Sequence, residues 1–127
     1  MIGKCALVID DDPTNKAVLG TLLQKQGVAC LSFASTGDLS GLVSQAKQVD
    51  VVFVDLTLHI RDGYQVLAAF RSAFPNIPVV ACTTHTSEMT TARACGFDGF
   101  LGKPLDSKKF PGQLARILSR QGVWEIR

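Results

Sequence analysis

The sequence predicts one α/β domain, in which a parallel sheet is covered by helices on both faces. Its 127 residues suit a single hydrophobic core and are too few for two. Five short β-branched runs alternate with five segments of helical period, and the runs at 5–9 and 51–54 are apolar throughout, as in strands buried on both faces. Such alternation favours parallel pairing through right-handed crossovers. We therefore expect one domain over 1–127, with no output domain in this chain.

Each element follows from its local pattern. The predicted strands are residues 5–9, 28–33, 51–54, 79–82 and 99–102, of which the second is the least apolar and suits an edge. Apolar stripes predict four helices: Val18, Leu22 and Leu23; Leu39, Leu42, Val43 and Ala46; Val66, Leu67, Phe70 and Phe74; Phe110, Leu114, Ile117 and Leu118. Asp12-Pro13 reads as a helix cap plus first helical residue, and Gly27 and Gly96 suit helix ends. The segment 86–95 is the weakest helix, because Thr90-Thr91 are poor helix formers.

Composition excludes several classes of protein. The net charge is +2 and the basic residues are scattered, so we expect no direct binding to nucleic acid. The four cysteines show no C-x-x-C spacing, which favours a reducing compartment without a zinc site. Neither a signal peptide nor an apolar run of membrane-spanning length is present, so we expect a cytoplasmic protein without a membrane partner.

Polar residues follow four of the predicted strands. Asp10-Asp11-Asp12 follows the first, Asp55 the third, Thr83-Thr84 the fourth and Lys103-Pro104 the fifth. In the flavodoxin-like strand order 2-1-3-4-5 these strands are neighbours, and ligands bind beyond their carboxyl ends. Carboxylates gathered there would repel by about 4 kcal/mol for each close pair at an effective dielectric near 20, more than one lysine offsets. Oxygen ligands of this kind favour Mg²⁺, for which Mn²⁺ can substitute.

Four motifs at these strand ends carry a family resemblance. They are Val8-Ile9-Asp10-Asp11-Asp12-Pro13, Val54-Asp55-Leu56 through Asp62-Gly63-Tyr64, Val80-Ala81-Cys82-Thr83, and Gly99-Phe100-Leu101-Gly102-Lys103-Pro104. Together they resemble the receiver domain of two-component response regulators, over essentially the whole chain. The resemblance implies a flavodoxin-like (βα)5 fold with a five-stranded sheet, and a phosphoprotein that accepts a phosphoryl group as an aspartyl phosphate.

The resemblance also implies roles for single residues. Asp10 and Asp11 would hold Mg²⁺, together with the backbone carbonyl of Thr57, while Asp55 would be both a metal ligand and the phosphoryl acceptor. Positioning and electrostatic stabilisation are what phosphoryl transfer chiefly requires.

The remaining implied roles concern phosphoryl contacts and switching. The Thr83 hydroxyl and the Lys103 ammonium would contact phosphoryl oxygens, and the Lys103-Pro104 bond would be cis. Thr83 and Phe100 would couple the charge to surface shape, as a population shift between two conformers. The chain would then be a signalling switch with no separate substrate turnover, that is, not an enzyme in the usual sense.

Partners follow from the same resemblance. A sensor histidine kinase or a histidine phosphotransfer protein would donate the phosphoryl group. The partner face would be formed by about residues 86–119, while the downstream target and a homodimer stay open.

This chain departs from the family pattern at three places. Leu58-His59 stands where Met-Pro is common, so the loop lacks a proline that would restrict it. Thr84 is larger than the usual residue, and Phe100 replaces a frequent tyrosine and so lacks its hydroxyl. The lifetime of a phosphoaspartate therefore does not follow from the family.

Other functions compete with this one. A phosphohydrolase of the haloacid-dehalogenase type would need an acid at position 57, where Thr57 stands. A flavin-binding module would place its phosphate beside Asp10-Asp11-Asp12, which would repel it. A pseudo-receiver would keep the fold as an interaction domain without phosphorylation. His59 and His85 lack a third nitrogen or sulfur ligand at suitable spacing, which favours solvated loop residues. For Trp124, packing of the C-terminal tail ranks ahead of a docking anchor.

Overall fold

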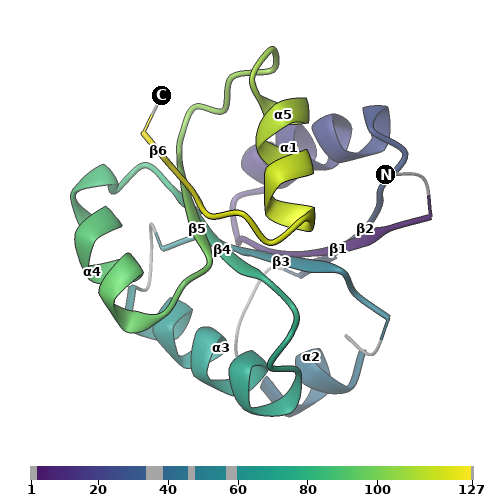
Figure 1. Cartoon of the computed structure of the whole chain (residues 1–127). Coiled ribbons are helices and arrows are strands. Elements are labelled where there is room, and N and C mark those ends of the chain that lie inside the picture. The colour runs from purple at the N-terminus through teal and green to yellow at the C-terminus, as the bar shows by residue number, and fades with distance from the viewer. Residues whose placement is uncertain (1–2, 34–38, 46–47, 57–59, 127) are drawn as a thin grey trace.

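The computed structural model describes residues 3–33, 39–45, 48–56 and 60–126. In chain order the elements are β1 (Cys5–Ile9), α1 (Pro13–Lys25), β2 (Ala29–Phe33), α2 (Leu39–Gln45), β3 (Val51–Val54), α3 (Ile60–Ala73), β4 (Val79–Thr83), a short 3-10 helix (Thr86–Glu88), α4 (Met89–Cys95), β5 (Gly99–Gly102), α5 (Phe110–Leu118) and β6 (Val123–Glu125). Figure 1 shows α1 and α5 on one face of the sheet and α2, α3 and α4 on the other. The predicted α/β architecture is confirmed.

The sheet contains six strands in the order β2-β1-β3-β4-β5-β6, and every neighbouring pair is parallel. The predicted order of the first five strands is confirmed, but the prediction of a five-stranded sheet is wrong. Residues 123–125 add a sixth strand beside β5. Three residues are too short for period-two alternation to identify a strand, which is why the sequence did not predict it.

Two hydrophobic layers hold the helices to the sheet. On the side of α3 and α4, a cluster that includes Leu7, Phe70 and Phe100 is buried. On the side of α1 and α5, a second cluster includes Phe53 and Phe110, whose ring centroids lie 6.4 Å apart. Adjacent strand residues alternate between the two clusters, so the central strands are buried on both faces.

The predicted stripe of α1 is wrong at one position. Val18 is 47% exposed, whereas Leu19, Leu22 and Leu23 are buried. These three leucines are spaced at i, i+3 and i+4, so they lie on one face of the helix. Val18 lies about 100° around the helix axis from the centre of that face.

The predicted helix boundaries agree with the backbone. The Asp12 side chain accepts hydrogen bonds from the backbone N–H groups of Thr14 (2.8 Å) and Asn15 (3.3 Å), and Pro13 begins α1. Gly27 and Gly96 follow α1 and α4 with φ of 75° and 106°, values that favour glycine. In the segment predicted as the weakest helix, α-helical geometry begins only at Met89. The ends of α1 and α4 are therefore encoded locally.

Two further observations bear on the excluded classes. No helix in the part of the chain that the structure describes is long and apolar enough to cross a membrane. All four cysteines are free thiols; Cys82 is buried, Cys5 and Cys30 are half-buried, and Cys95 is exposed.

Candidate functional site

Strand register brings the predicted polar residues together at the carboxyl ends of the strands. Ile9 and Val54 are paired across β1 and β3, so Asp10 and Asp55, the next residue on each strand, lie side by side. The Asp55 N–H donates to the Ile9 carbonyl at 3.0 Å. Thr83 pairs with Gly102 across β4 and β5, and the Lys103 N–H donates to the Thr83 carbonyl at 2.9 Å. Backbone pairing alone therefore fixes where these four side chains begin.

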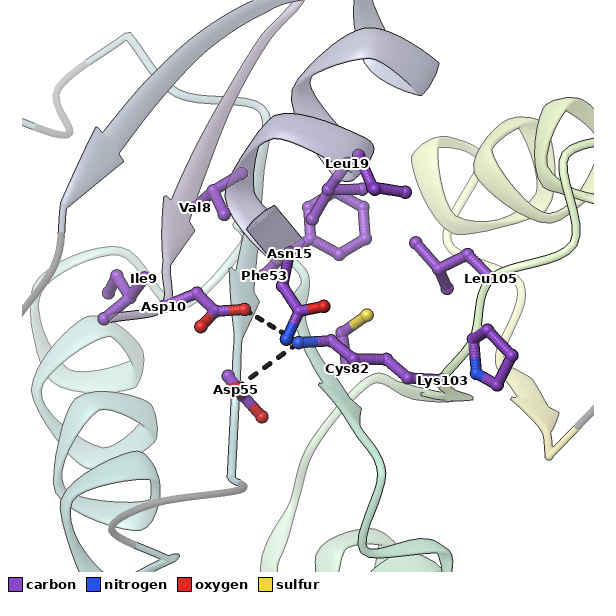
Figure 2. A pocket seen from close by; sticks show the side chains of 12 residues that line it. Val8, Ile9, Asp10, Asn15, Leu19, Phe53, Asp55, Cys82, Lys103 and Leu105 are labelled. Carbon is purple, nitrogen blue, oxygen red and sulfur yellow. Dashed lines mark hydrogen bonds and ion pairs between the residues drawn. The ribbon is translucent and has the colours of Figure 1, made fainter. Parts of the chain in front are cut away.

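The centre of the site is a lysine between two aspartates. The Lys103 Nζ lies 2.7 Å from Asp10 Oδ2 and 3.3 Å from Asp55 Oδ2 (Figure 2). The three side chains are only 9%, 6% and 7% exposed, respectively. Residues 45 or more positions apart in the sequence thus form one buried ion cluster, with one positive and two negative formal charges.

Asp10 uses both of its carboxylate oxygens. Oδ1 accepts a hydrogen bond from the Asp12 backbone N–H at 2.9 Å, while Oδ2 accepts one from Lys103. Burial raises the pKa of the Asp10 carboxyl, and these two hydrogen bonds only partly oppose that effect. For Lys103, burial acts to lower the pKa, but the hydrogen bond to Asp10 and the surrounding negative groups raise it overall. The ammonium is therefore charged at neutral pH.

A pocket of about 110 Å³ opens beside this cluster, between α1 and the loop after β5. Asn15 lines it and extends from the first turn of α1 toward the Lys103 ammonium (Figure 2). Cys82 also lines the pocket, and burial raises the pKa of its thiol to about 12, so the thiol stays protonated. Neither residue was predicted from sequence. Asn15 could have been found from its place in the helix turn that follows Asp10.

Not every predicted metal ligand joins the cluster. Asp11 is exposed, and Thr57 lies outside the described residues, as do Leu58 and His59. Within those described residues, no group of three or more His, Cys, Asp or Glu side chains is placed to hold a metal ion. The two carboxylates nonetheless suit a hard cation that keeps several waters, since they supply only oxygen and exceed the lysine in charge.

The two predicted switch residues are both fully buried. Thr83 ends β4, and its hydroxyl accepts a hydrogen bond from the His85 N–H at 3.1 Å. Phe100 lies in the core with 0% exposure and pairs with Trp124 of β6. The Lys103–Pro104 peptide is cis, as the resemblance implied. Thr84 and His85 are exposed beside the site.

Comparison with known families agrees with this geometry. The model of the response regulator receiver domain matches residues 6–115, which include every element from β1 to most of α5. The chain belongs to the response regulator receiver family. As a receiver domain it is a component of two-component signalling. β6 lies beyond the matched residues.

Curated relatives of the chain are longer proteins. The chain is 33% identical over 102 residues to the transcriptional regulatory protein GlrR of Escherichia coli, covering 79% of this chain and 23% of that protein. It is 29% identical to ethylene receptor 2 of rice, covering 91% of this chain and 16% of the receptor. It spans 52% of the probable regulatory protein TcrX of Mycobacterium tuberculosis, at 28% identity. The receiver domain thus matches only part of each relative.

Solved structures share the receiver fold. A response regulator receiver domain protein from Clostridium thermocellum superposes with a TM-score of 0.80 at 23% identity, covering 92% of this chain and 95% of the other. Chemotaxis protein CheY4 of Vibrio cholerae gives a TM-score of 0.76 at 24% identity, covering 90% and 98%. At these identities the likeness establishes the fold alone.

Proposed function

We propose that this receiver domain accepts a phosphoryl group on Asp55 from a phosphohistidine donor. The observation that carries the proposal is the Lys103 ammonium held between the carboxylates of Asp10 and Asp55. Such a cation, 3.3 Å from an Asp55 oxygen, would be close enough to contact a phosphoryl oxygen bound to that carboxylate. The proposal needs no movement of the lysine backbone, which is fixed by pairing with β4.

The chemistry is a transfer between two nucleophiles. An oxygen of the Asp55 carboxylate forms a bond to phosphorus while the P–N bond of the donor breaks, and the electron pair of that bond stays on the imidazole nitrogen. No proton needs to move in this step, so positioned charge matters more than general acid–base groups. Lys103 would neutralise part of the charge that the phosphoryl oxygens carry.

A divalent cation fits the same site. Asp10, Asp11, Asp55 and the carbonyl of Thr57 are the residues that we propose hold Mg²⁺, or Mn²⁺ in its place. The ion would supply charge neutralisation for the phosphoryl oxygens. In this arrangement Asp10 would keep its hydrogen bond to the Asp12 N–H and share its other oxygen with Lys103, so the start of α1 would stay tied to the site.

Thr83 and Phe100 form the proposed readout. Thr83 would turn its hydroxyl from the His85 N–H toward a phosphoryl oxygen, exchanging one hydrogen bond for another. Phe100 is already fully buried, so its part in switching would begin from an inward position, beside Trp124, and not from the surface. The charge on Asp55 would thereby be communicated to β5 and its neighbours.

The wider role that we propose is a phosphorelay switch without separate substrate turnover. The donor would be a sensor histidine kinase or a histidine phosphotransfer protein; relatives of the chain include a probable histidine kinase of rice and a hybrid signal transduction histidine kinase of Dictyostelium discoideum. We further propose that the receiver domain works in the cytoplasm.

Intact-mass spectrometry tests the proposal directly. The protein is incubated with Mg²⁺ and phosphoramidate, a small donor with a P–N bond, and a mass increase of one phosphoryl group is expected. Asp55→Asn should show no increase. Asp50→Asn is the matched control, because Asp50 precedes β3, at the end of that strand opposite to Asp55. There it accepts a hydrogen bond from the Cys5 N–H. Equal labelling of the wild type and Asp55→Asn would remove Asp55 from the acceptor role.

A separate assay distinguishes a switch from a hydrolase. Phosphate released from a small phosphate ester should stay at the level of a protein-free blank. Sustained release that depends on Asp55 would replace the switch with a phosphohydrolase.

A further inference from the structure

The sixth strand pairs with β5, which would otherwise be an edge strand with unpaired backbone groups. Gly99, Phe100 and Leu101 of β5 pair in parallel with Val123, Trp124 and Glu125. In Figure 1 this strand runs beside β5, between α4 and α5. We call residues 123–126 the strap. The face between α4 and α5 that was predicted to receive partners is therefore already occupied by a segment of the same chain.

The strap is held to the helices on both sides. On one side, the Arg93 guanidinium of α4 lies 4.9 Å from the centroid of the Trp124 ring, a cation–π contact. On the other side, Gln113 and Arg116 of α5 bind the Glu125 carboxylate at 2.8 and 3.1 Å. Gln113 is only 4% exposed, and its Oε1 has no hydrogen-bond partner in the described part of the chain. Two adjacent strap residues thus join α4 to α5 across β5.

Glycines let the strap approach β5 closely. A Cβ at Gly99 would lie 3.0 Å from the Val123 carbonyl oxygen, and one at Gly102 would collide with the Ile126 backbone. Gly102 is the residue that pairs with Thr83 and precedes Lys103. The end of the strap therefore contacts Gly102, which lies between the two residues proposed to contact the phosphoryl group, Thr83 and Lys103.

The strap has fewer paired and fewer buried residues than the central strands. Only three residues pair with β5, Trp124 and Glu125 are half-buried, and Ile126 is 41% exposed. Beside Ile126, a groove of about 610 Å³ runs past Thr84, Lys103 and Lys109. A short segment with an open groove at its end can separate locally without unfolding of the domain.

We propose that the strap is a built-in ligand of the face between α4 and α5, released when the phosphoryl group on Asp55 draws on Thr83 and Lys103 and so shifts Gly102. This inference rests on the proposed phosphorylation of Asp55. The edge uncovered would bind an extended segment of a partner protein by adding it as a strand to β5. The strap itself shows what fits there: an aromatic residue followed by an acidic residue, matching Arg93 on α4 and Arg116 on α5.

The single tryptophan of the chain reports directly on the strap. Trp124 emission and its quenching by acrylamide are measured with Mg²⁺, before and after phosphoramidate, while intact mass is recorded on the same samples. Phosphorylation should shift the emission to longer wavelength and raise the quenching constant about twofold, as local opening exposes the ring. Asp55→Asn should show neither change. A mass increase with unchanged emission and quenching would overturn the strap proposal alone, whereas absence of a mass increase would overturn the proposed function and the coupling with it.

A glycine substitution tests the strap independently of phosphorylation. Gly102→Ala places a methyl group against the Ile126 backbone and should raise acrylamide quenching in the unphosphorylated protein. Gly112→Ala is the matched control, because its added methyl group would meet no atom within 4 Å beyond its chain neighbours and the nearby backbone of α5. Quenching that is the same in both variants and the wild type would overturn the role of Gly102. For binding, a peptide of residues 122–127 should associate with phosphorylated protein more tightly than with Asp55→Asn, and equal affinity would refute the uncovered edge as the docking site.

Discussion

Replacing Lys103 with methionine should destabilise the domain through repulsion between Asp10 and Asp55. Both Oδ2 atoms contact the same nitrogen, at 2.7 and 3.3 Å. They therefore lie no farther apart than about 6 Å, a separation at which two unit charges repel by about 3 kcal/mol at an effective dielectric near 20. We expect Lys103→Met to lower the free energy of unfolding by about 3 kcal/mol, at the lower end of values for breaking a buried ion pair.

Urea denaturation at neutral pH with a metal chelator measures this loss. Asp55→Asn in the Lys103→Met background should recover most of it, because one carboxylate then remains without a like-charged neighbour. Lys109→Met is the control, since Lys109 is exposed, and should change the free energy of unfolding by no more than about 0.5 kcal/mol. Lowering the pH should shrink the Lys103→Met loss as the Asp10 carboxyl, whose pKa burial raises, takes up a proton. A loss that Asp55→Asn leaves untouched would refute charge repulsion as its cause.

Two further predictions concern the helix cap and the strap. Asp12→Ala removes the hydrogen bonds to Thr14 and Asn15 and should cost about 1 kcal/mol in urea denaturation, whereas Asp12→Asn should cost little; equal losses would argue against capping. The hydrogen bonds from Gln113 and Arg116 lower the pKa of Glu125, so their stabilisation is present above the ordinary pKa of a glutamate and is lost as the pH falls through the lowered value. Acid titration should therefore shift Trp124 emission in the wild type before the domain unfolds, and an identical titration of Glu125→Gln would contradict this.

Most of the site followed from strand ends alone. Asp10, Asp55 and Lys103 each come directly after a strand, and parallel register requires such residues to meet. The sequence could not show that Lys103 would lie between both carboxylates, because that depends on side-chain rotamers and on the position of α1. Asn15 was missed, although its place in the first turn of α1, soon after Asp10, was a signal for it. The ligand roles of Asp11 and Thr57 stay predictions.

Sequence patterns did not predict two features, the short strand β6 and the buried face of α1. The strap has one buried residue, Val123, followed by two half-buried ones, and a pattern of that length does not distinguish a strand from a tail. Its position depends on contacts with Arg93 of α4 and Arg116 of α5, which the sequence of the strap itself does not encode. In α1, Val18 and Leu19 are equally apolar neighbours, and only the orientation of the helix on the sheet decides which of them is buried.

The two hydrogen bonds to Asp10 have a consequence for how the protein depends on its surroundings. The Asp10 carboxylate, whose pKa burial raises, has donors supplied by the chain itself, one from a backbone N–H and one from a lysine. We therefore expect the domain to fold without a divalent cation, even though the proposed chemistry uses one. If the proposed chemistry holds, a cell depleted of magnesium would keep folded protein that cannot accept a phosphoryl group until the ion returns.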